Sequence, residues 1–255
     1  MSESVAIVTG ASQGIGRASA IRLARDFSAI ALVARNLEYL NDAAAQVKAT
    51  GAEPLVLDLD LREPRSAEVV VSRTLERFGR IDALLNIAGA VPQIDLFEMS
   101  DEHWDDGMAL KLHGARRLTL RAWEALKARG AVVLISGNSA EFPKAPYAAV
   151  GTINAAIVAL AKAFSDRGLK DGVTVNSVLP GPVMTGRRQS YLAKWAPAHK
   201  VGVEEATQKF LQDAGISRYG EPEEIAELTA FLVSPSARWM TGAALRMDGG
   251  EVKSI

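Results

Sequence analysis

The chain has 255 residues, of which 48% are hydrophobic and 23% are charged. A chain of this length buries a substantial core, and α/β folds of this size often form one domain. The 29 basic and 30 acidic residues give a formal net charge of -1, and no long run of Lys or Arg provides the positive surface that nucleic acid requires. The absence of cysteine excludes disulfides, thiol catalysis and thiolate metal sites.

Other partners are also disfavoured. The three histidines, His103, His113 and His199, share no metal-ligand spacing, so we expect no metal site. The first apolar run, Val5–Val8, is far too short for a signal peptide or a membrane span. We therefore expect a cytoplasmic protein that has a small-molecule substrate and binds neither membrane nor nucleic acid.

Short apolar runs rich in β-forming residues recur along the chain, separated mostly by amphipathic stretches of helical length. This alternation predicts a Rossmann-type, doubly wound α/β fold: a mostly parallel sheet of seven strands with helices on both faces, in one domain over residues 1–255. The expected strands are Val5–Val8, Ala29–Val33, Leu55–Leu57, Ala83–Leu85, Ala131–Ile135, Val173–Val178 and Ala243–Met247.

A glycine-rich turn follows the first expected strand and leads into a helical pattern. Its glycines permit a tight turn and a close backbone approach, so the free N–H groups of the helix N-terminus can meet a pyrophosphate. Strand, turn and helix in this order predict a dinucleotide site, with an ordinary strand-to-helix turn as the alternative. The candidate contacts in the turn are Gly10, Ser12, Gln13, Gly14, Ile15 and Gly16.

The end of the second expected strand carries a cofactor-preference signal. A site for NAD usually has an acid here that holds the ribose hydroxyls, but this strand ends in Ala34–Arg35–Asn36. Arg35, with Arg17 as a helper, can pair with a 2'-phosphate, which favours NADP(H) while leaving NAD(H) possible. The alternative is an exposed arginine without a role.

Two features follow late in the chain. Glu221–Pro222–Glu223–Glu224 resembles a helix start, because proline and carboxylates suit a first helical turn. The polar segment 185–220 lacks the strand pattern and is interpreted as a lid over the substrate pocket, or equally as a helical excursion used for packing or oligomerisation. Its aromatic residues, Tyr191, Trp195 and Phe210, indicate a partly apolar substrate or a packing role.

These motifs together resemble the short-chain dehydrogenase/reductase family over about Val5 to Gly250. Thr9 to Gly16 matches T-G-x-x-x-G-x-G, Asn86–Ile87–Ala88–Gly89 matches N-N-A-G with one change, and Met247–Asp248–Gly249–Gly250 fits the family's ending. The resemblance implies that Asp60 holds the adenine amino group and that Pro180–Gly181 with Thr185 holds the nicotinamide carboxamide. The cofactor contacts expected beyond the glycine turn are Arg35, Asp60, Leu61, Asn86, Ala88, Gly89, Pro180, Gly181, Val183 and Thr185.

The family's catalytic residues are not found at the matching positions. The family uses a tyrosine acid, a lysine four residues later, an orienting serine and an asparagine that supports a proton relay. Reading Tyr147 as the acid requires a gap and places Gly151 at the lysine position. The gap-free register, which we prefer, puts substitutes at all four positions: Val150 for tyrosine, Asn154 for lysine, Gly137 for serine and Lys111 for asparagine.

Two residues offer a chemical replacement. Lys111 would restore the missing positive charge, unless it is solvated or paired with an acid. Tyr147 lies one turn before Val150 and would serve as a displaced acid oriented by Ser139 or Asn138, unless it only lines the pocket. Asn154, on a small apolar helix face, needs a partner if it is buried.

The resulting hypothesis is an NADP(H)-dependent oxidoreductase that acts on a carbonyl or alcohol through an atypical site. The candidate catalytic residues are Lys111, Tyr147, Ser139 and Asn154. The alternatives are a cofactor-binding sensor or partner subunit without turnover, or a non-redox enzyme. The resemblance also implies a homodimer or homotetramer.

Overall fold

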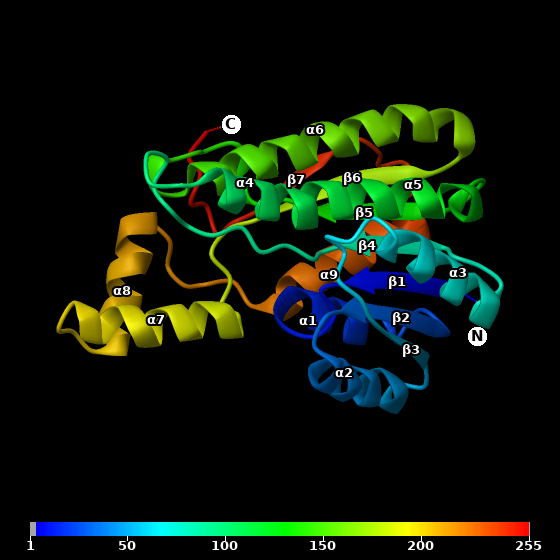
Figure 1. Cartoon of the computed structure of the whole chain (residues 1–255), viewed down its shortest axis with the longest axis horizontal. Helices are drawn as coiled ribbons and strands as arrows, with labels where there is room; N and C mark the ends of the chain where they lie inside the picture. The colour runs from blue at the N-terminus through cyan, green and yellow to red at the C-terminus, as the bar shows by residue number, and fades with distance from the viewer. Residues whose placement is uncertain (1–3, 255) are drawn as a thin grey trace.

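A single parallel sheet forms the centre of the protein. The computed structural model describes residues 4–254, and its seven strands lie in the order β3-β2-β1-β4-β5-β6-β7, each parallel to its neighbours (Figure 1). The predicted fold class is confirmed; of the predicted domain 1–255, residues 1–3 and 255 lie outside the described part. The strands are β1 (Val5–Thr9), β2 (Ala29–Ala34), β3 (Glu53–Asp58), β4 (Ala83–Asn86), β5 (Ala131–Ile135), β6 (Thr174–Pro180) and β7 (Ala244–Met247).

Helices cover both faces of the sheet, as parallel strands require. One face carries α1 (Gly14–Leu23), α2 (Leu37–Ala49) and α9 (Pro222–Val233). The other face carries α3 (Ser66–Phe78), α5 (Ala115–Leu126) and α6 (Ala148–Asp171). The expected helix start at Glu221 is confirmed, because Glu221 and Glu224 form a reciprocal capping box at the start of α9. Residues 4–254 also contain the short 3-10 turns η2 (Asn138–Ala140), η3 (Ala145–Tyr147) and η4 (Pro235–Ala237).

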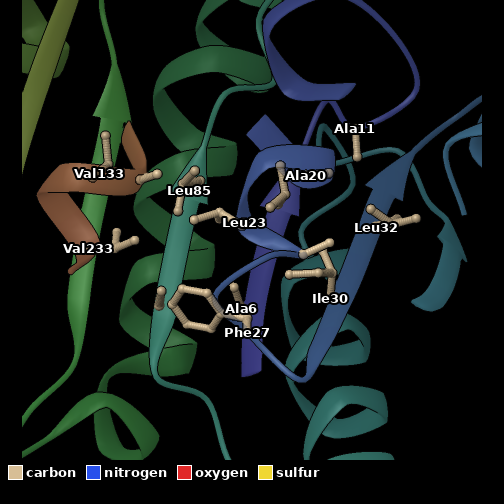
Figure 2. Close-up of a cluster of buried hydrophobic side chains, with 14 of the residues drawn as sticks. Ala6, Ala11, Ala20, Leu23, Phe27, Ile30, Leu32, Leu85, Val133 and Val233 are labelled. Carbon is tan, nitrogen blue, oxygen red and sulfur yellow. The ribbon is translucent and has the colours of Figure 1, made fainter. Parts of the chain in front are cut away.

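Each face of the sheet has its own apolar core. Figure 2 shows the core beneath α1, where Leu23 and Phe27 pack against Ile30 of β2 and Leu85 of β4. On the opposite face, Ile157 and Phe164 of α6 pack with residues of β4, β5 and α5. Strand residues therefore point alternately into the two cores, and both cores are buried on folding.

The helical stretch Ala145–Asp171, formed by η3 and α6, is by length and composition apolar enough to cross a membrane, with a mean hydropathy of 1.5 over its most apolar part. Its apolar side, including Ile153 and Ile157, is buried in the protein. This burial is typical of a core helix that covers a parallel sheet.

A π-helical segment interrupts the helix before β5. The helix α4 (Asp101–Gly107) continues through η1 (Met108–Gly114) into α5. In such a segment each backbone hydrogen bond spans one residue more than in an α-helix, which changes the directions of the side chains. Such π-helical turns frequently lie at functional sites. Lys111 lies in the middle of η1.

The segment 185–220 folds as a helical excursion beyond the sheet. Its helices α7 (Gly186–Ala198) and α8 (Val203–Ala214) lie together to one side of the molecule (Figure 1). They enclose small apolar clusters of their own, centred on Leu192, Ala196 and Ala206 and on Leu211. A bridge between Val183 and Gly220 joins the two ends of the excursion.

Candidate active site

A cleft of about 1320 Å³ opens at the carboxyl ends of the strands, where β1 and β4 lie side by side and the chain order of the sheet reverses. In open α/β sheets this switch point is the usual place for a ligand. The volume exceeds the roughly 300–1,000 Å³ of most small-molecule pockets, so the cleft has room for an extended ligand.

The glycine turn after β1 forms one wall of the cleft. Gly10 adopts the left-handed region with φ of 67°, and a side chain on it would meet the backbone of Ala88 at 3.1 Å. A Cβ atom on Gly16 would lie 2.1 Å from the carbonyl oxygen of Gly10. The turn therefore requires glycine at both positions, and its close packing leaves the N-terminus of α1 open to a phosphate group.

Thr9 ties the glycine turn to the end of β4. Its hydroxyl accepts hydrogen bonds from the backbone N–H groups of Ile87 at 2.8 Å and Ala88 at 3.0 Å. Asn86, expected to contact the cofactor, lies behind the cleft instead: it is buried, and its amide donates to the hydroxyl of Thr119 on α5 at 3.0 Å. Asn86 thus fixes β4 to the neighbouring helix, and its side chain does not line the cleft.

Arg35 stands at the end of β2, where the cleft begins. Its guanidinium lies 3.7 Å from a carboxylate oxygen of Asp60, and 60% of its side chain is exposed. The expected helper Arg17 donates instead to Gln46 on α2 at 3.3 Å and does not line this cleft. Arg35 is therefore an exposed cation at this end of the cleft.

The other cofactor residues expected from the sequence lie together around the cleft. From the carboxyl end of β6, Pro180, Gly181, Val183 and Thr185 close its opposite wall. A Cβ atom on Gly181 would meet the backbone of Asp248 at 2.6 Å, so this approach also requires glycine. The remaining lining residues among those expected are Gly10, Ser12, Gln13, Gly14, Ile15, Gly16, Arg35, Asp60, Leu61, Ala88 and Gly89.

A lysine-centred network lines the cleft at the end of β5. The Lys111 ammonium donates to Oδ1 of Asn154 at 2.5 Å and to the backbone carbonyl of Ser136 at 2.9 Å. Asn154 is buried and donates from its own amide to the hydroxyl of Ser139 at 2.8 Å. The partners that the buried amide of Asn154 requires are therefore the ammonium of Lys111 and the hydroxyl of Ser139.

Gly137 makes room for this network. A Cβ atom on Gly137 would lie 2.5 Å from Nδ2 of Asn154, closer than nonbonded atoms approach. Gly137 and Asn154 are therefore sterically matched, and a serine at position 137 would displace the amide that holds Lys111.

The surroundings of Lys111 disfavour its charged form. Burial, and to a smaller extent the positive charge of nearby Arg187, lower the pKa of its ammonium to about 8. A lysine with this pKa carries a proton at neutral pH and releases it more readily than a solvated lysine. The cleft therefore contains a side chain that can donate a proton near neutral pH.

Tyr147 and Ser139 take other positions than expected. Tyr147 ends the 3-10 turn η3, one residue before α6 begins, and it does not line the cleft. Val150 does line the cleft. Ser139 reaches the site only through its hydrogen bond from Asn154.

Some lining residues escaped the sequence analysis. Arg187 and Arg188 begin α7 and reach the cleft, and His103 of α4 joins them. The adjacent arginines stood in a segment without a strand pattern, where charged residues are usually solvated. In the described chain, no group of three or more His, Asp or Glu side chains is arranged to hold a metal ion.

A doubly wound sheet with a glycine-rich dinucleotide turn at its switch point defines a nucleotide-binding class of oxidoreductase fold. The chain belongs to the short-chain dehydrogenase/reductase family: the family model described as enoyl-(acyl carrier protein) reductase matches residues 10–251. A short-chain reductase of Streptomyces niveus is 30% identical over 249 residues, which cover 97% of this chain and 94% of the relative.

Solved structures agree with this assignment. The L-sorbose reductase of Gluconobacter frateurii, solved with NADPH and L-sorbose, has a TM-score of 0.95 and 29% identity, and the match covers 100% of this chain and 98% of that one. An NADPH-dependent reductase involved in bacilysin biosynthesis has a TM-score of 0.92 and 28% identity, with 100% of both chains covered.

Proposed function

We propose that this protein is an NADP(H)-dependent oxidoreductase that interconverts a carbonyl compound and its alcohol, with Lys111 as the proton donor. The observation that carries the proposal is the Lys111 ammonium on the cleft wall, held by Asn154 and by the carbonyl of Ser136. This ammonium places a proton donor in the same cleft as the expected dinucleotide site.

The residues of the cleft fit the cofactor. The crowded glycines Gly10 and Gly16 leave room only for backbone, which suits a pyrophosphate against the N-terminus of α1. Arg35 would hold the 2'-phosphate, and Pro180 with Thr185 would hold the nicotinamide. NADPH is preferred over NADH because β2 is followed by Arg35, at the place where a site for NAD usually has an acid that holds the ribose hydroxyls. When bound, the cofactor supplies the hydride.

The catalytic positions of the family are substituted in this reading. Val150 has no proton to donate, and Asn154 has no charge. Lys111 and Asn154 together still provide one ammonium and one amide, but on exchanged helices: the ammonium comes from η1 and the amide from α6. The positive charge at this point of the cleft is thereby kept.

In the reduction, Lys111 binds the substrate carbonyl oxygen and passes it a proton, becoming a neutral amine that is reprotonated from solvent. The two hydrogen bonds to Asn154 and Ser136 orient its Nζ atom. Asn154 and Ser139 are positioning residues in this scheme. Tyr147 has no step, since it lies outside the cleft lining.

The test is NADPH consumption by the purified full chain with varied aldehydes and ketones. We expect turnover, and we expect Lys111→Met to reduce kcat/KM by roughly a hundredfold or more, the usual contribution of a general acid. NADPH binding by calorimetry should stay within about threefold. Tyr147→Phe is the matched control and should retain activity. Cofactor binding without any turnover would contradict the proposal.

Three further features belong to the proposal. The helices α7 and α8 form a lid, which their separate apolar clusters support. Trp239, with 98% of its surface exposed, and Phe231 of α9 support a contact between subunits of a homodimer or homotetramer. The cytoplasm is the proposed location.

A further inference from the structure

Charge is distributed unevenly along the cleft. At the end formed by β2, Arg35 lies near the carboxylate of Asp60. At the other end, three cationic side chains line the wall, from η1 and from the start of α7: Lys111, Arg187 and Arg188.

Gly89, just after β4, brings two of these cations together. A Cβ atom on Gly89 would meet the side chain of Lys111 at 3.0 Å, so the lysine lies directly against it. Its carbonyl oxygen accepts from both terminal nitrogens of Arg187, at 3.4 and 3.3 Å. Arg187 is also close enough to depress the pKa of Lys111. Two positive groups thus converge on one glycine without a negative group between them.

None of the three cations has a carboxylate within ion-pair distance in residues 4–254. Arg187 is bound only to a backbone carbonyl, and Arg188 lies over the rings of Tyr191 and Tyr219, 5.6 Å from each centroid. Several other arginines of the protein do form ion pairs with carboxylates, as Arg62 does with Asp106. Like charges that converge in a cleft raise the local concentration of anions and are stabilised by binding one.

We propose that the substrate carries a carboxylate beside its reacting carbonyl, as in a 2- or 3-oxo acid, and that Arg187 binds this carboxylate while Lys111 faces the carbonyl oxygen. This inference rests on the proposed function and specifies its substrate class. A guanidinium binds a carboxylate through two parallel hydrogen bonds, and the exposed Arg187 can exchange its weak contact with Gly89 for that pair.

The cofactor pyrophosphate is the other anion that this end could meet. It belongs to the glycine turn, where Gly14 lies against Thr185 at the start of α7: a Cβ atom on Gly14 would meet Thr185 at 3.3 Å. Arg187 extends from there to Gly89, on the side of Lys111. The proposal therefore assigns Arg187 to the substrate, and the test separates the two sources.

The first measurement is calorimetric titration of the protein saturated with NADPH, the cofactor form that meets the carbonyl substrate. Oxamate, an unreactive analogue of a 2-oxo acid, is compared with its uncharged ethyl ester. We expect oxamate to bind at least about tenfold more tightly, and Arg187→Gln to remove this difference because it removes a charge-assisted pair. Arg73→Gln, an exposed arginine of α3 outside the cleft, is the control.

Equal binding of acid and ester, or no binding of either, would overturn the inference. It is also overturned if Arg187→Gln weakens NADPH binding as much as it weakens oxamate binding, because the arginine then serves the pyrophosphate. NADPH consumption with 2- and 3-oxo acids and with their methyl esters completes the test. Turnover of esters and acids alike sustains the proposed function and refutes the substrate class. Oxamate binding without turnover of any carbonyl compound refutes the proposed function and leaves the anion site standing.

Discussion

Adding one methyl group at Gly137 should destabilise the whole fold through the lysine network. In Gly137→Ala the new Cβ would lie 2.5 Å from Nδ2 of Asn154, a buried side chain with little freedom to move. Overpacking costs about 1–3 kcal/mol, and displacing the amide loses hydrogen bonds worth about 1 kcal/mol each. We therefore expect the free energy of unfolding to fall by about 3 kcal/mol, which lowers Tm by roughly 6–12 °C for a chain of this size.

The assay is thermal and denaturant unfolding of four proteins: the wild type, Gly137→Ala, Asn154→Ala and the double variant. With alanine at 154 the collision disappears, so Gly137→Ala should then cost less than about 1 kcal/mol, a coupling of about 2 kcal/mol. Gly202→Ala is a matched control, since nothing lies within 4 Å of its added Cβ. Additive effects in the double variant would refute the reasoning.

Three other predictions concern protons and phosphates. The ammonium of Lys111 has a pKa of about 8, and only its protonated form donates a proton. The kcat/KM for carbonyl reduction should therefore be level below pH 8 and fall about tenfold per pH unit above it. Lys111→Arg should remove this break from the pH–rate profile, and a break that stays unchanged in the variant would exclude Lys111 as the proton donor. Arg35→Ala should weaken NADPH binding roughly 10–150-fold while NADH binding stays within about threefold, as measured by calorimetry. An equal loss of affinity for both cofactors would contradict the assignment of Arg35 to the 2'-phosphate. Hydrogen bonds from Arg218 and from the backbone of Glu221 lower the pKa of Glu224 to about 2. The contribution of Glu224 to stability is therefore present above its ordinary pKa of 4.5 and is lost as the pH falls toward 2. Glu224→Gln should lower Tm at pH 7, and a difference in Tm from the wild type that persists unchanged at pH 2 would contradict this.

The architecture was predictable because parallel strands buried on both faces are almost continuously apolar. Val5–Val8 and Ala131–Ile135 stand out for this reason, and the structure places strands there. The start of β3 was missed by two residues, since Glu53 and Pro54 are unusual in strands; β3 is the edge strand of the sheet, where both are tolerated.

The site was predictable where one local motif carries it and less so where distant segments meet. The glycine turn was predictable from the residues Gly10 to Gly16 alone. The partnership of Lys111, Asn154 and Gly137 depends on the π-helical segment and on how α6 packs, and neither has a signal in the sequence. Tyr147 seemed one helical turn from Val150, but the helix begins only after it. Arg187 lacked any marker beyond its neighbour Arg188.

We expect the excursion made by α7 and α8 to be a cooperative unit of low local stability. Its small clusters around Leu192 and Leu211 are separate from the two large cores, so we expect it to open while the sheet stays intact. Amide hydrogens of α7 should accordingly exchange with solvent faster than those of β4 or β5. A ligand that bridges Arg187 and Gly89 would couple this opening to occupancy of the cleft, and slower exchange in α7 would then report the moment at which the cleft is filled.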